Sequence, residues 1–175
     1  KNLDNLVRAF SLVCGDRACA DLDLVFTGDP KGSGFLSSHE SLLRCINEHP
    51  AATNRIHFTG YVSDEELPTL YSDALVTAMP AFSEGFGLPA LEGLACGTPV
   101  MATADGAVAE IADNAGLYFD PYDIDSIATA IRRIAVDAQL LEILRSRCVP
   151  RAAKFDWDRS ARSLLDVFNR VRAEV

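Results

Sequence analysis

Apolar residues follow two different patterns along this chain of 175 residues. In the first pattern they recur every three or four residues, which predicts amphipathic helices. The clearest example follows Asn2, a candidate N-cap, and consists of Leu3, Leu6, Val7 and Phe10. In the second pattern they form short uninterrupted runs that stop near glycine or proline, which predicts buried strands. The predicted strands lie at 22–27, 56–59, 74–79, 99–103 and 116–119.

Helices are predicted between these runs. Ser63 and Glu66 have the spacing of a capping box, so a helix should begin there and reach about Tyr71. Pro89 and Gly97 mark the first turn and the end of a helix over 88–96. Further helices are predicted around 42–46, after Asp123, and around 138–149 and 157–173. Because continuously apolar strands alternate with helices, the pattern predicts an α/β fold with a Rossmann-like parallel sheet and helices on both faces.

Composition and charge disfavour several classes of protein. Hydrophobic residues make up 49% of the chain and charged residues 23%, which fits one globular domain over residues 1–175. The net charge is −9 and no basic run is present, so a general nucleic-acid binder is disfavoured. The five cysteines lack C-x-x-C spacing, which predicts free thiols in a reducing compartment rather than disulfides or zinc. No apolar run approaches the ~20 residues of a membrane-spanning helix.

The stretch from Ser83 to Gly93 carries the candidate chemistry. It follows a predicted strand and leads into a predicted helix, so it lies where ligands bind in parallel sheets. Gly85 and Gly87 let the backbone approach a ligand closely and adopt positive φ. The helix start at Gly87 and Leu88 offers free N–H groups and a positive dipole end. Together these features predict an anion cradle suited to a diphosphate.

Two glutamates flank this predicted cradle. Glu84 immediately precedes it, and Glu92 lies about 6 Å along the helix axis from its start, at about 1.5 Å per residue. A carboxylate accepts two hydroxyl hydrogen bonds at once, which suits vicinal sugar hydroxyls. The arrangement fits a nucleoside-diphosphate sugar. The residues alone leave a plainer reading open, because glycine-rich loops are common and helix glutamates are usually solvated.

The segment from Glu84 to Glu92 resembles the E-x7-E motif of retaining GT-B-fold glycosyltransferases of family 4, the glycosyl transferases group 1. The resemblance covers essentially the whole chain, in the family's order. Its other matching segments are Lys1–Asn2, Val25–Gly28, Phe58–Ser63, Ala95–Val100 and Ala109–Leu117. It implies a nucleotide-sugar-binding domain, the C-terminal half of a two-domain enzyme, with the N-terminal acceptor domain and a phosphate-binding Arg lying upstream of Lys1.

The resemblance also implies a role for each matched residue. Glu84, as the catalytic residue, would contact hydroxyls of the transferred sugar, and Glu92 would hold the ribose diol. Lys1 would pair with the diphosphate. Val62 would lie near the base, and Gly28 would allow close approach near the phosphates. Backbone amides would serve the sugar and the phosphates at Gly85, Phe86, Gly87 and Leu88.

The implied parent is a hexosyltransferase-type enzyme of polysaccharide or glycolipid biosynthesis. It would transfer sugar, with retention of configuration, to a sugar, glycan or lipid-linked acceptor bound by the N-terminal domain. No cofactor and no metal are expected, since no Asp-x-Asp motif is present. The implied location is cytoplasmic, with peripheral attachment to the inner membrane through the other domain left open. The isolated chain is expected to transfer no sugar.

Three alternatives remain. One is another enzyme on the same fold, such as a nucleotide-sugar epimerase or a phosphorylase. Another is a non-catalytic module that binds nucleotide sugars or a partner protein. A Rossmann oxidoreductase is disfavoured, because Gly28 and Gly32 lack G-x-G-x-x-G spacing. Outside the site, Tyr71 is expected in the core, Asp105–Gly106 in a turn, and Trp157 as an anchor of the last helix.

Overall fold

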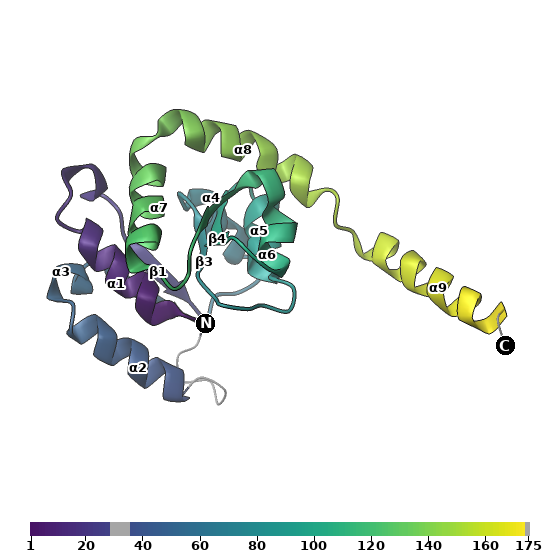
Figure 1. Cartoon of the computed structure of the whole chain (residues 1–175), viewed down its shortest axis with the longest axis horizontal. Coiled ribbons are helices and arrows are strands. Elements are labelled where there is room, and N and C mark those ends of the chain that lie inside the picture. Colours follow the sequence, from purple (N-terminus) through teal and green to yellow (C-terminus); the bar gives the residue numbers. More distant parts are fainter. Residues whose placement is uncertain (29–35, 174–175) are drawn as a thin grey trace.

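The computed structural model of the chain describes residues 1–28 and 36–173. Strands and helices alternate along it (Figure 1). The strands are β1 (Leu24–Thr27), β2 (Ile56–Gly60), β3 (Thr77–Met79), β4 (Val100–Thr103) and β5 (Gly116–Phe119). The α-helices are α1 (Leu3–Val13), α2 (Leu36–Asn47), α3 (Pro50–Thr53), α4 (Leu67–Asp73), α5 (Leu88–Ala95), α6 (Ala107–Ala112), α7 (Ile124–Val136), α8 (Ala138–Ala152) and α9 (Trp157–Ala173).

The strands form two parallel sheets, one of β1 and β2 and one in the order β3-β4-β5. Val100 of the central strand β4 lies opposite Thr77 on one side and Gly116 on the other. All four residues of β4 are buried, as expected of a strand covered on both faces. The predicted α/β fold with parallel strands and flanking helices is confirmed, although the pairing divides the predicted sheet into two.

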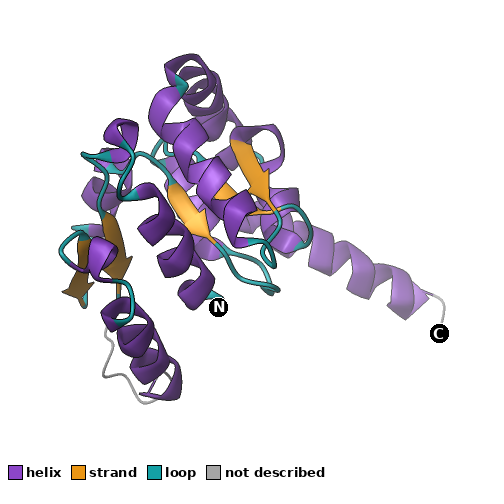
Figure 2. Ribbon diagram, turned by 60° about the vertical axis from the view of Figure 1, so that its left-hand side comes forward, coloured by secondary structure: helices purple, strands orange, loops and turns teal. Residues whose placement is uncertain are grey.

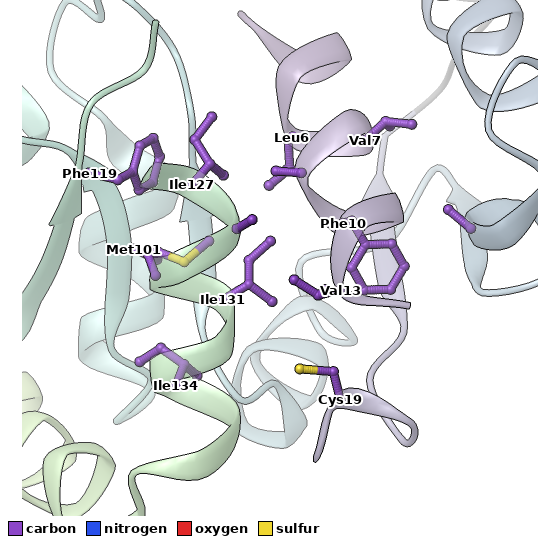
Figure 3. Packing of buried hydrophobic residues seen from close by; sticks show 14 of the residues in the cluster. Leu6, Val7, Phe10, Val13, Cys19, Met101, Phe119, Ile127, Ile131 and Ile134 are labelled. Carbon is purple, nitrogen blue, oxygen red and sulfur yellow. The ribbon is translucent and has the colours of Figure 1, made fainter. Parts of the chain in front are cut away.

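One face of the β3-β4-β5 sheet is covered by α7, and α1 packs on the far side of α7 (Figure 3). Leu6 and Val13 of α1 face Ile127 and Ile131 of α7, while Met101 of β4 closes the cluster on the sheet side. These positions are the apolar stripes that the helical periodicity predicts. Burying one such side chain stabilises the fold by about 1.5–3 kcal/mol.

A second apolar cluster joins α5, α6 and α8 to the sheet. Ala90 and Leu94 of α5 are fully buried, and Val108 of α6 and Cys148 of α8 pack in the same cluster. Because α5 presses its Ala90–Leu94 face into the molecule, its opposite face and its N-terminus stay accessible. This packing fixes the helix that carries Glu92.

Local sequence signals determine where some of the helices begin. The Ser63 N–H donates to Glu66 Oε2 and the Glu66 N–H donates to Ser63 Oγ, each at 3.3 Å, so the predicted capping box is present. The helix after it, α4, begins at Leu67 and reaches Asp73. Helix α6, which follows the Asp105–Gly106 turn directly, was not predicted from the sequence.

The prediction for Trp157 is wrong. Its side chain is 82% exposed, and α9 extends away from the other elements in both views (Figures 1 and 2). The apolar positions of α9 are exposed as well, including Leu164, Leu165 and Phe168. Their helical spacing reflects an amphipathic helix, but no described element packs against it.

Candidate functional site

The loop from Pro80 to Gly87 joins β3 to α5 at the carboxyl end of its sheet. Gly87 is the N-cap of α5 and has φ 94°, in the left-handed region. A Cβ on Gly87 would lie 2.7 Å from Val108 Cγ2, so this position excludes a side chain on two grounds. Gly85 differs from the prediction, because it is not among the glycines with positive φ; a Cβ there would meet nothing within 4 Å.

The start of α5 presents free hydrogen-bond donors. In the described part of the chain, the N–H groups of Gly85, Phe86, Gly87 and Leu88 donate to no protein acceptor. Unpaired N–H groups at a helix start, together with the helix dipole, favour an anion. The predicted cradle therefore has the donors that its chemistry requires.

A carboxylate lies on each side of these donors. Glu84, in the loop, is half-buried, and its side chain makes no hydrogen bond or ion pair with any residue in 1–28 or 36–173. Glu92, in the second turn of α5, is exposed and accepts a hydrogen bond from the Tyr71 hydroxyl, 3.0 Å from its Oε2. Glu84 thus keeps its full capacity to accept hydrogen bonds, and Glu92 keeps most of its capacity.

Lys1 is brought to the same edge by its neighbour Asn2. The Asn2 amide Nδ2 donates to the carbonyl oxygens of Pro80 (2.9 Å) and Pro121 (3.0 Å), which follow β3 and β5. Asn2 occupies the predicted N-cap position of α1 and has φ 60°, but its side chain makes no cap hydrogen bond. Its side chain joins two strand ends instead, and this places Lys1 beside the loop that precedes Glu84.

Gly28 and Val62 lie beyond the carboxyl ends of the other two strands. Gly28 has φ 111°, and its N–H donates to the Gly60 carbonyl oxygen at 2.9 Å. Val62 is half-buried. No hydrogen bond between described residues joins either one to the α5 loop. The strand arrows point toward the side of the molecule where the N-terminus lies (Figure 2), so the carboxyl ends of both sheets face that side.

The exposed ring of Phe86 contacts residues at and just after the C-terminal end of α8. It meets the ring of Phe155 edge-on, with centroids 6.2 Å apart and an interplanar angle of 88°. The Arg151 guanidinium lies over the Phe155 ring, 5.1 Å from the centroid of that ring. Because Arg151 also donates to the Ile111 carbonyl oxygen at 2.7 Å, the loop is linked to the end of α8 and to α6.

The family model for glycosyl transferases group 1 matches residues 1–155. The chain belongs to this family. It is 34% identical over 136 residues to the O-antigen chain mannosyltransferase B of Escherichia coli, covering 78% of this chain and 36% of that protein. It is 36% identical over 175 residues to the D-inositol 3-phosphate glycosyltransferase of Salinispora tropica, covering 98% of this chain and 36% of that protein.

Solved structures show the same fold. Sucrose-phosphate synthase from Thermosynechococcus elongatus superposes with a TM-score of 0.80 at 29% identity, covering 100% of this chain and 43% of that one. Anabaena HepE, solved in complex with UDP, gives a TM-score of 0.78 at 22% identity, covering 95% of this chain and 44% of that one. This chain therefore spans less than half the length of each of these relatives. No described helix is both long enough and apolar enough to cross a bilayer.

Two residues of the site could not be found by sequence reasoning. Tyr71, expected only as a core residue, lies 21 positions before Glu92, beyond any helical repeat. Asn2 is followed by an apolar helical pattern that is typical of a cap. An Asn tolerates the left-handed conformation, but no local signal indicates that its side chain binds carbonyl groups of two distant loops.

Proposed function

We propose that this chain is the donor-binding domain of a retaining hexosyltransferase and holds a nucleoside-diphosphate sugar at the start of α5. The observation that carries the proposal is the row of four unpaired N–H groups from Gly85 to Leu88 between the carboxylates of Glu84 and Glu92. A diphosphate accepts hydrogen bonds from such groups, and a sugar on each side of it can donate hydroxyls to a carboxylate.

Each residue of the site has a proposed role, which the family resemblance supports. Glu84 faces the transferred sugar, and its half-buried carboxylate has no competing partner in the described part of the chain. Glu92 binds the ribose diol. Lys1 binds the diphosphate, and the hydrogen bonds of its neighbour Asn2 hold the N-terminus beside the loop. Gly28 allows close approach near the phosphates, and Val62 lies near the base.

The proposed reaction is sugar transfer with retention, by attack of an acceptor hydroxyl on the face that the diphosphate leaves. A leaving-phosphate oxygen takes the acceptor proton, while this domain positions the donor and stabilises the charge on the departing diphosphate. The family resemblance supports this route, and it calls for neither a metal nor a cofactor. The proposed setting is cytoplasmic synthesis of a polysaccharide or glycolipid.

The acceptor site is proposed to lie in an N-terminal domain. The chain spans 36% of the Escherichia coli mannosyltransferase, which leaves room for such a domain in relatives of that length. Alone, this chain should therefore bind the donor and transfer no sugar. Nothing in the described geometry favours the epimerase, the phosphorylase or the non-catalytic module.

Calorimetry with UDP, GDP, ADP and their hexose derivatives tests the proposal. The best of these ligands should bind, and Glu92→Ala should weaken it roughly ten- to hundredfold, because hydrogen bonds to a charged group contribute about 1.5–3 kcal/mol. Glu142→Ala, which removes an exposed glutamate from α8, is the charge-matched control and should leave affinity unchanged. Equal affinity of wild type and Glu92→Ala would refute the ribose assignment.

A further inference from the structure

Tyr71, near the end of α4, is held at both of its ends. Its carbonyl oxygen accepts a hydrogen bond from the hydroxyl of Thr98, a residue that is only 2% exposed. Its phenol hydroxyl donates to Glu92 Oε2 at 3.0 Å. Thr98 follows α5 and Glu92 lies within it, so both bonds attach the same tyrosine to the same helical segment.

The ring of Tyr71 packs against α5 next to Gly93. A Cβ on Gly93 would lie 2.4 Å from Thr77 Oγ1 and 3.6 Å from Tyr71 Cδ1. A Cβ there would collide with the buried Thr77 hydroxyl, for which the described residues provide no hydrogen-bond partner. The absence of a side chain at Gly93 therefore lets α5 lie close to β3. The position of the phenol relative to Glu92 is therefore set by three packed elements rather than by a mobile side chain.

The phenol acts on Glu92 as a donor. Burial raises the pKa of Tyr71, and the hydrogen bond to Glu92 acts in the same direction, so the proton stays on the tyrosine. A carboxylate offers about four lone-pair positions. One of them is taken by Tyr71, and the others suffice for two vicinal hydroxyls. An exposed carboxylate without this bond would have to be ordered when the ligand binds, which weakens affinity.

We propose that Tyr71 is a positioning residue that fixes the Glu92 carboxylate for recognition of a 2′,3′-diol, and so makes the site select ribonucleotides. The inference deepens the proposed function and rests on the assignment of Glu92 to the ribose. The Tyr71→Phe variant should therefore lose part of one property, its preference for a nucleotide with both ribose hydroxyls over a nucleotide with neither.

The experiment is calorimetry of the 175-residue chain with UDP, GDP and ADP, each paired with its 2′,3′-dideoxy counterpart. For the best-binding pair, Tyr71→Phe should lower the ratio of the two affinities roughly three- to tenfold, since one hydrogen bond to a charged group is lost at an exposed site. Affinity for the dideoxy nucleotide should stay unchanged. Glu92→Gln should lower the same ratio at least as far.

Tyr118→Phe is the matched control. Its half-buried phenol donates to the Asp113 carbonyl oxygen at 2.5 Å, so this variant also loses a phenol hydrogen bond, but away from α5. It should leave the ratio unchanged, which separates positioning from a general loss of stability. If Glu92→Gln lowers the ratio and Tyr71→Phe does not, the role of Tyr71 is overturned and the proposed function stands. If neither variant lowers the ratio, or no nucleotide binds, both are overturned.

Discussion

Replacing Gly87 by alanine tests how the start of α5 is built. Gly87 has φ 94°, and a left-handed backbone costs an ordinary L-residue about 1–2 kcal/mol. The added Cβ would also lie 2.7 Å from Val108 Cγ2, in the well-packed α5–α6 cluster. Overpacking of this kind costs about 1–3 kcal/mol. Gly87→Ala should therefore lower the free energy of unfolding by about 2–5 kcal/mol.

Gly97, at the other end of α5, separates the two contributions. It has φ 83°, and a Cβ there would meet nothing within 4 Å. Gly97→Ala should therefore show the backbone cost alone, about 1–2 kcal/mol. In the double variant Gly87→Ala/Val108→Ala the crowding methyl is gone, so the loss should be smaller than the sum of the two single losses.

Urea denaturation followed by circular dichroism measures these free energies, and an unchanged m-value shows that the comparison is valid. The nucleotide should bind more weakly to Gly87→Ala under native conditions, since the N–H groups of the cradle are displaced. If Gly87→Ala and Gly97→Ala lose equal stability and Val108→Ala shows no coupling, the steric reasoning is refuted.

Three further predictions concern the sugar, the metal and alkaline pH. Glu84→Gln should weaken binding of the nucleotide sugar roughly tenfold and leave the sugar-free nucleotide unaffected; equal losses in calorimetry would mean that Glu84 does not face the sugar. EDTA should leave nucleotide affinity unchanged, and a loss that Mg²⁺ or Mn²⁺ restores would contradict the helix-based account. Burial raises the pKa of Cys148 from 9.0 to about 11, so its contribution to stability is complete below pH 9 and is lost as the pH rises through 11. Cys148→Ala should therefore show a shallower fall in the free energy of unfolding over that range, by up to about 1.4 kcal/mol per pH unit, and an unchanged slope would contradict the assignment.

Much of the fold could be predicted because its signals are local. The run Val100–Ala102 is continuously apolar, and β4 is buried throughout. Ser63 and Glu66 form the capping box that their spacing predicts. The division into two sheets could not be predicted, since strand pairing depends on which runs meet in space. The short α6 was missed because the turn signal at Gly106 overlaps its start.

The residues of the candidate site also fall into two groups, those that local sequence signals predict and those that only the folded chain shows. Gly87, Glu84 and Glu92 lie on one continuous segment, so spacing along the chain indicated the cradle and its two carboxylates. Tyr71 and Asn2 act across 21 and 78 positions, respectively. Such contacts arise from packing, as at Gly93, where the absence of a side chain lets α5 pack closely against Thr77 of β3. Only the folded chain shows which distant polar groups meet.

The most direct test is a crystal structure of the chain with its best-binding nucleoside-diphosphate sugar. The diphosphate should lie within hydrogen-bond distance of the N–H groups of Gly87 and Leu88. Both ribose hydroxyls should contact the Glu92 carboxylate, and the transferred sugar should contact Glu84. A diphosphate bound elsewhere, or a ribose that does not touch Glu92, would contradict the central claim.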